Sequence, residues 1–260
     1  MNFRLNESTI PRWLQVFVTA IVLFGIVIWQ FPIKWLAGTV SQASHCRVVL
    51  ADPSGTLWRG GTAIGFSEPT LDGNACRPPQ AMTERLFWNT GCNLSERTCS
   101  IRIEAATLRQ PLQISVSLTG VRIHEDEIRL PSEILEVMGA PWTILHPRGD
   151  LTVRWSDLRF QGTSKNGNIH ADLYSLSSPV SLIRPLGSYS LDASLSGNGI
   201  SYTLSTTEGP LILEAEGQIA NDGKAIGQGQ ASATPESQDA LNGLLGLIGR
   251  KQGNIYKLVF

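Results

Sequence analysis

The segment YSLDASLSGNGISYTL, residues 189–204, alternates apolar and polar side chains on both sides of a Gly-Asn-Gly turn. Its apolar members are Tyr189, Leu191, Ala193, Leu195, Ile200, Tyr202 and Leu204. Successive side chains of a strand point to opposite faces of a sheet, so this alternation is typical of a half-buried β-strand. The segment therefore predicts two antiparallel strands that share one apolar and one polar face.

Similar alternating runs lie on both sides of this segment, over residues 112–118, 151–155, 169–173 and 211–217. Nearer the N-terminus, Val48–Leu50, a turn over residues 52–55 and Thr56–Trp58 predict a strand–turn–strand element, and Ile255–Phe260 predicts a last strand. The Pro- and Gly-rich residues 68–80 predict a loop. We therefore predict a mainly β fold, an elongated or curved antiparallel sheet built as a meander.

Two short helices are expected to interrupt this sheet. The first covers Ser132–Met138, with Ser132 as its N-terminal cap and Gly139 as its stop. The second is capped by Ser237 or Asp239 and ends at Gly249. Its residues Leu241, Leu244, Leu245 and Ile248 recur at helical spacing, which predicts one apolar stripe packed against the sheet.

The four cysteines of the chain are Cys46, Cys76, Cys92 and Cys99. An even number of cysteines predicts two disulfides in an oxidising compartment. Cys92 and Cys99 enclose only a six-residue polar turn that would let adjacent strands pair, so we prefer Cys92–Cys99 with Cys46–Cys76 among the three possible pairings. A zinc site is the alternative, but the spacings lack the C-x-x-C pattern of such sites.

The longest apolar segment, residues 13–29, carries no charge and predicts one transmembrane helix that reaches residue 35 with its interfacial flank. Arg4 and Arg12 precede it and only Lys34 closely follows, so residues 1–12 should form a cytoplasmic tail and residues 36–260 a β domain outside the cytoplasm. Pro32 predicts that residues 30–44 form a linker without a helix. The alternative is a signal peptide cleaved near residues 41–43.

The sequence offers little support for catalysis or for a cofactor. None of the four histidines belongs to a zinc motif, and no hydrolase or nucleotide-binding fingerprint occurs. His124–Glu127 gathers one imidazole and three carboxylates, which is either a weak divalent-cation site or a solvated hairpin tip. The net charge of −1, without a clustered basic face, argues against nucleic acid as a partner. We expect neither enzymatic activity nor a small-molecule ligand.

The most distinctive short motif is Ser54-Gly55-Thr56-Leu57-Trp58-x-Gly60. It predicts a tight turn that begins a strand with a large aromatic side chain. Trp58 would then lie either in the core or in a contact with a partner protein. Our hypothesis for partner contact consists of Ser54, Gly55, Thr56, Leu57, Trp58 and Gly60.

This motif and several later ones resemble the N component of the type II (general) secretion pathway. The similar segments are residues 53–60, 130–141, 147–155, 176–179, 185–189, 209–211 and 244–258. The segment with Cys76, Cys92 and Cys99 does not align with the family pattern. The resemblance implies a non-enzymatic accessory component of the bacterial inner membrane, with a periplasmic β domain and other secretion components as partners. It supplies no catalytic residues.

An alternative function comes from a second resemblance. Single-span proteins with a curved sheet of alternating strands also resemble envelope proteins of the AsmA type, whose apolar grooves are associated with lipid traffic. The inner face of the sheet distinguishes the two functions. A continuous exposed apolar trough would favour lipid binding, whereas a filled core would favour docking of proteins.

Overall fold

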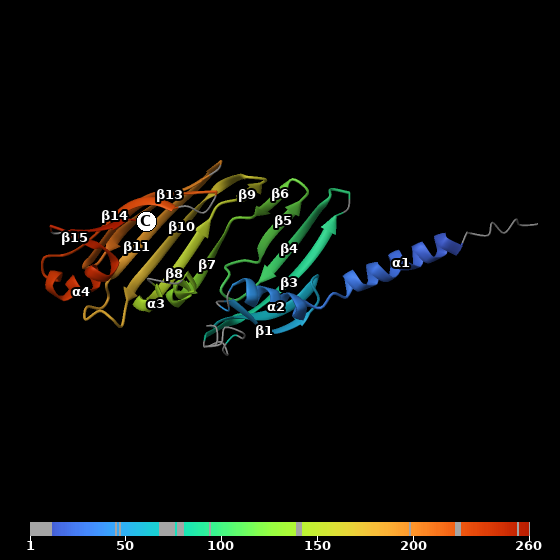
Figure 1. Ribbon diagram of the computed structural model, residues 1–260, viewed down its shortest axis with the longest axis horizontal. Coiled ribbons are helices and arrows are strands. Elements are labelled where there is room, and N and C mark those ends of the chain that lie inside the picture. The colour runs from blue at the N-terminus through green and yellow to red at the C-terminus, as the bar shows by residue number, and fades with distance from the viewer. Residues whose placement is uncertain are drawn as a thin grey trace, which may run out of the picture.

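The computed structural model describes residues 12–44, 46, 48–67, 76, 81–93, 95–138, 142–197, 199–221, 225–253 and 255–259. Most of these residues form one long, curved sheet (Figure 1). Helix α1 (Arg12–Trp29) projects away from the N-terminal end of the sheet, and α4 (Gln238–Ile248) lies at the opposite end (Figure 1).

Over the described residues the sheet contains sixteen strands, and every pair among them is antiparallel. The N-terminal strands are β1 (Val48–Gly55), β2 (Arg59–Phe66), β3 (Ala81–Asn93), β4 (Thr98–Glu104), β5 (Leu112–Ser117), β6 (Gly120–Ile123) and β7 (Asp126–Pro131). The next are β8 (Arg148–Trp155), β9 (Leu158–Gln161), β10 (Ser164–Ser177), β11 (Gly187–Gly197) and β12 (Gly199–Glu208). The last are β13 (Leu211–Ala220), β14 (Ala225–Ala233), β15 (Arg250–Gln252) and β16 (Ile255–Val259). The predicted mainly β, antiparallel fold is confirmed.

The strand register aligns the apolar residues in rows across the sheet. Leu191 of β11 pairs with Leu204 of β12, and Leu204 pairs with Ala215 of β13. Ala215 pairs in turn with Gly229 of β14, and Gly229 with Leu258 of β16. Directly paired residues lie on the same face of a sheet. The alternation in residues 189–204 and its neighbours therefore produces one apolar face and one polar face.

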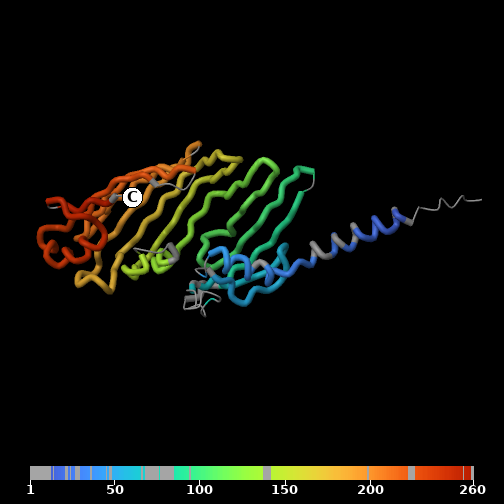
Figure 2. The backbone as a smooth tube through the Cα atoms, viewed as in Figure 1, coloured from blue at the N-terminus to red at the C-terminus, as the bar shows by residue number. Residues whose placement is uncertain are grey.

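The most buried part of the core lies where α4 packs on the apolar face. Leu241 is 0% exposed and Leu245 is 1% exposed. They cluster with Leu151, Leu173, Leu176, Leu186, Tyr189, Leu211, Ala231, Leu244 and Tyr256. The tube in Figure 2 shows the C-terminal strands bending around this helix. The predicted apolar stripe is confirmed, although Ser237, at the N-cap position, makes no side-chain capping bond.

The helix predicted at Ser132–Met138 is present as the 3-10 helix η1 (Ser132–Met138), followed by the short helix α3 (Trp142–Leu145), which was not predicted. The predicted capping role of Ser132 is wrong. Its hydroxyl is buried and, among the described residues, has no hydrogen-bond partner. A 3-10 helix bonds residues three apart and is tighter than the α-helix on which the capping prediction was based.

The N-terminal region differs from the prediction in two respects. The predicted linker over residues 30–44 is wrong, because α2 (Ile33–Ala43) forms there. Pro32 precedes α2 in an extended conformation, where a missing backbone N–H costs no helical hydrogen bond. Within the described part of the chain, no helix is both long and apolar enough to cross a membrane, so the transmembrane helix predicted over residues 13–35 is not supported. Residues 1–11 of the predicted tail lie outside the described residues.

Both preferred disulfides are present. Cys46 is joined to Cys76 across a sequence separation of 30, and Cys92 to Cys99 across a separation of 7. Cys92 and Cys99 are directly paired residues of β3 and β4, as the short polar turn between them predicts. Apart from Cys76, the loop predicted over residues 68–80 lies outside the described residues.

An ion pair joins β6 to the connection between β8 and β9. Arg122 donates from Nε to Oδ1 of Asp157 at 2.8 Å, and Arg159 donates to Oδ2 at 3.0 Å. The hydrogen bond from Arg122 is the main reason that the pKa of Asp157 falls from 3.8 to about 2. Because the folded state binds this proton more weakly than the unfolded state, the pair stabilises the fold above pH 3.8 and loses its effect as the pH falls towards 2.

We therefore expect Asp157→Asn to lower the free energy of unfolding near neutral pH by no more than about 1 kcal/mol, the upper range for a solvent-exposed pair. The difference from the wild type should shrink as the pH falls from about 4 to about 2, where the wild-type carboxyl becomes protonated. Urea unfolding at a series of pH values measures this difference. A difference that stays constant down to the lowest pH would contradict the assignment.

Candidate functional site

The 54–60 motif forms the turn between β1 and β2, but not in the predicted way. Ala51 pairs with Ala63 and Ser54 with Gly61, so a bulge in β1 absorbs the two residues between them. The predicted turn at residues 52–55 is thus wrong. The chain reverses at residues 56–58, which were predicted as a strand, and Gly55 pairs with Gly60 to close the turn. A bulge accommodates an extra residue without ending strand pairing, which explains the difference.

Thr56 and Gly55 shape this turn locally. The Thr56 hydroxyl accepts hydrogen bonds from the backbone N–H groups of Trp58 and Arg59, both at 3.3 Å. The backbone N–H of Thr56 donates to the carbonyl of Arg59 at 2.9 Å. Gly55 has a φ of 92°, and a Cβ atom there would lie 2.4 Å from the Arg59 carbonyl oxygen. The turn itself therefore favours a hydroxyl side chain at position 56 and requires a glycine at position 55.

Trp88 of β3 holds the turn in place. Its indole Nε1 donates to the carbonyl of Leu57 at 3.1 Å, and its ring covers Gly60, with which it pairs across the strands. A Cβ atom at Gly60 would lie 2.5 Å from that ring. The sequence analysis missed Trp88. The signal available in the sequence was an aromatic residue that could pair with a glycine of the neighbouring strand. Recognising that pair requires the register of the two strands, which the sequence alone does not give.

Trp58 is neither fully buried nor among the strongly exposed apolar side chains. Its carbonyl accepts a hydrogen bond from the Thr90 N–H at 2.7 Å, so the backbone at this position is fixed by β3. The choice between core packing and partner contact for Trp58 therefore stays a prediction.

The same turn is joined to the end of α1. The backbone N–H of Leu57 donates to the carbonyl of Phe31 at 3.1 Å, and Pro32 forms an antiparallel bridge with Thr56. Residues 56–57 thus contact the chain two to three residues after α1 ends. The motif fixes where the N-terminal helix leaves the sheet (Figure 1).

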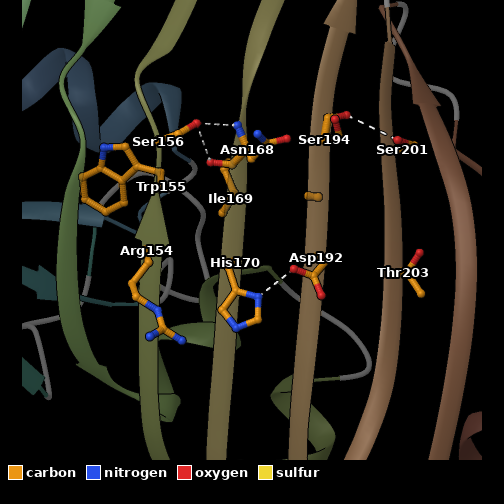
Figure 3. Close-up of a pocket in the computed structure, with 11 residues that line it drawn as sticks. Arg154, Trp155, Ser156, Asn168, Ile169, His170, Asp192, Ser194, Ser201 and Thr203 are labelled. Atoms are coloured by element: carbon orange, nitrogen blue, oxygen red, sulfur yellow. Dashed lines mark hydrogen bonds and ion pairs between the residues drawn. The ribbon is translucent and has the colours of Figure 1, made fainter.

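A second candidate site is a shallow hollow of about 370 Å³ on the polar face of β8, β10, β11 and β12. Arg154, His170, Asp192 and Thr203 occupy paired positions and form a row across it (Figure 3). His170 contacts Asp192 from Nδ1 at 2.6 Å and Asp172 from Nε2 at 3.1 Å, and Arg154 also pairs with Asp172. The row is a charged network held by strand pairing.

The hollow does not bring a nucleophile to a base. Ser156 accepts the Asn168 backbone N–H at 2.9 Å, and both ring nitrogens of His170 already contact carboxylates. In the predicted 124–127 cluster, the His124 ring bonds to Ser115 at 3.1 Å and Asp126 accepts the N–H of Glu127. The described residues contain no group of three or more His, Cys, Asp or Glu side chains placed to hold a metal ion. The geometry here supports a polar surface and provides no assembled catalytic centre.

The inner, apolar face carries its most buried core where α4 packs, and Ile134 and Leu135 of η1 and Leu145 of α3 pack against the same cluster. Farther from α4 the same face continues through β4, β5 and β6, where Ile101 pairs with Ile114 and Ile114 with Ile123. These three side chains are half-buried. The inner face thus combines a filled core at its C-terminal end with an apolar surface that extends towards the N-terminal end.

Three comparisons with known proteins bear on this arrangement. A family model described as type II secretion system (T2SS), protein N matches residues 47–258. The search of curated proteins and the search of solved structures found no match. The matched range begins one residue before β1 and ends inside β16, so it coincides with the sheet and excludes α1 and α2.

Proposed function

Because this chain belongs to the family of type II secretion system protein N, we propose that it is an accessory component of that machine, anchored in the bacterial inner membrane and facing the periplasm. It acts through protein–protein contacts in the export of folded proteins across the outer membrane and catalyses no reaction. The observation that carries this proposal is the family match over the whole sheet. The described part of the sheet supplies surfaces and edges of the kind that bind proteins.

The exposed side chains of α1 support membrane anchoring through the N-terminal residues. Trp13 is 70% exposed, Phe17 59% and Leu23 58%. Exposure of these apolar side chains to water costs free energy, whereas the interior of a lipid bilayer accommodates them without that cost. The two disulfides support a periplasmic location for the sheet, since disulfides persist in oxidising compartments. In this proposal the residues before α1 are cytoplasmic, as the positions of Arg4 and Arg12 predict.

Contacts with other secretion components are proposed at two kinds of surface. The first is the 54–60 turn, where Trp58 is the best aromatic anchor of the motif. The second consists of the sheet edges at β1 and β15, which end the strand order and offer backbone groups for pairing with a partner strand.

The test is deletion of the gene in its host and complementation with variants that carry a photoreactive residue at position 58 or at position 118. Leu118 lies in the β5–β6 turn and is 82% exposed, so it serves as an exposed control away from the motif. We expect loss of cargo from the medium, accumulation of cargo in the periplasm, and crosslinks to secretion subunits from position 58. Normal secretion in the deletion strain would overturn the proposed role.

Lipid binding is a second candidate function. The continuation of the apolar face through β4, β5 and β6, beyond the core at α4, favours it. The deletion strain discriminates between the two functions. A defect in the outer-membrane permeability barrier with normal secretion would favour lipid traffic, whereas retained cargo with an intact barrier would favour the secretion component. Crosslinks from the inner face to phospholipid would supply direct support for the lipid function.

A further inference from the structure

We propose that Phe31, Trp35 and Leu57 form one patch that lies at the headgroup boundary of a lipid bilayer, so that the β1–β2 turn rests on the membrane surface. The inference deepens the proposed function, because it rests on the membrane anchoring of α1 and assigns a lipid partner to part of the 54–60 turn. We refer to these three residues as the boundary patch.

The members of the boundary patch are exposed and adjacent. Phe31 is 38% exposed, Trp35 72% and Leu57 40%. The rings of Phe31 and Trp35 lie 6.3 Å apart between centroids. The backbone bond from Leu57 to the Phe31 carbonyl, 3.1 Å long, brings the turn to the same place. Two segments that are separated in sequence thus bring exposed apolar residues close together.

The position of the patch relative to α1 fixes its depth. Phe31 follows Trp29, the last residue of α1, by two residues, and two residues span at most about 7 Å. Trp35 lies in the first turn of α2, where each residue adds about 1.5 Å. If α1 is in the hydrocarbon core, the patch lies at its edge. Aromatic side chains are enriched at this depth in membrane proteins.

The distribution of exposed residues on α1 favours lipid over a protein partner. Trp13, Phe17, Val18 and Ile26 are between 48% and 70% exposed. At about 100° per residue these positions lie on several sides of the helix. A protein partner would cover one side, whereas lipid surrounds an apolar helix completely. Lys34, exposed next to Trp35, adds a positive charge that anionic headgroups attract.

Because the turn is rigid, the boundary patch affects the orientation of the sheet relative to the membrane. The hydroxyl of Thr56 and the indole of Trp88 fix the backbone that carries Leu57. A patch held at the membrane surface therefore holds the attached strands β1, β2 and β3 at a set orientation. On this account part of the family motif orients the sheet on the membrane.

The experiment uses the full chain in vesicles of phosphatidylethanolamine and phosphatidylglycerol. A fluorescent amino acid is incorporated at position 57 or 35, or at control position 118 or 182, where the native leucines are 82% and 90% exposed. The vesicles carry spin-labelled lipids that quench near the headgroups or deep in the acyl chains. Co-flotation of the protein with the vesicles tests the anchoring separately, and circular dichroism verifies that each variant is folded.

We expect headgroup-proximal quenching to be several-fold stronger at positions 57 and 35 than at positions 118 and 182. Quenching by the deep label should be weaker than by the shallow label at position 57. Protein that floats with vesicles but is quenched equally at all four positions would overturn the boundary patch and leave the anchoring intact. Protein that fails to float would overturn the anchoring, and the boundary patch with it.

Discussion

The Leu241→Ala variant is expected to lose about 2–5 kcal/mol of unfolding free energy, the usual range for truncating a fully buried leucine. Leu241 is 0% exposed and packs among residues of β10, β11, β13 and β16. The cavity would lie between α4 and the apolar face of the sheet. Because β11 and β13 are hydrogen-bonded to neighbouring strands on both sides, they have little freedom to collapse into the space. Urea unfolding followed by circular dichroism measures the loss.

Leu247→Ala provides the matched control. Leu247 lies on the same helix and undergoes the same change, but it is 63% exposed. Its variant should remain within about 0.5 kcal/mol of the wild type, as surface substitutions do. Equal losses for the two variants would show that helix propensity dominates and that α4 does not close the core. Hydrogen exchange in β11 should increase in Leu241→Ala alone, since that strand forms part of the cavity wall.

The strands could be predicted from sequence because their signal is local. An alternation of period two indicates a strand whichever other strand it pairs with. Residues 189–204 and their neighbours therefore predicted both the strands and the common apolar face. The helix at residues 238–248 was predictable for the same reason, since Leu241, Leu244 and Leu245 recur at helical spacing. The Cys92–Cys99 bridge followed from the short turn between the two cysteines.

Other features depend on contacts that a single sequence does not display. α2 forms immediately after Pro32, although in a sequence a proline indicates a helix break as readily as a helix start. The turn at residues 56–58 was shifted by a bulge, whose extra residue becomes apparent only once β1 and β2 are paired. The candidate site shows the same limit. The 54–60 motif is visible in the sequence. Its hydrogen bonds with Trp88 and Phe31 could not be predicted, because these two residues are distant from it in sequence.

Family membership, suggested by short motifs along the chain, is confirmed by the match over residues 47–258. The motif residues have structural roles that explain part of this similarity. Gly60 makes room for the Trp88 ring, and Gly55 adopts a backbone conformation that disfavours other residues. Sequence similarity to the family at these two glycines is explained by the geometry of the turn. The contact made by Trp58 is therefore a separate question, which the crosslinking experiment addresses.

Removal of the Cys46–Cys76 disulfide is expected to cost about 3–4 kcal/mol, because it closes a loop of 30 residues in the unfolded chain. The loss should appear in urea unfolding of Cys46→Ser/Cys76→Ser under non-reducing conditions. Cys46 follows α2 and is 9% exposed, so this bridge fastens the chain that leads from the N-terminal helices into β1. In cells, the variant should be degraded more rapidly than the wild type.

Cys92→Ser/Cys99→Ser is the matched control, because its bridge closes only 7 residues and joins positions that β3 and β4 already pair. Its expected cost is smaller, about 2 kcal/mol on the same chain-entropy argument. An equal or greater loss for this pair would contradict the entropic account and indicate that strain or packing determines the effect. If the two bridges act independently, the quadruple variant should lose the sum of the two costs, since Cys46 and Cys76 lie outside the strands, whereas Cys92 and Cys99 lie within β3 and β4. A smaller combined loss would show that the N-terminal strands unfold as one unit once either bridge is absent.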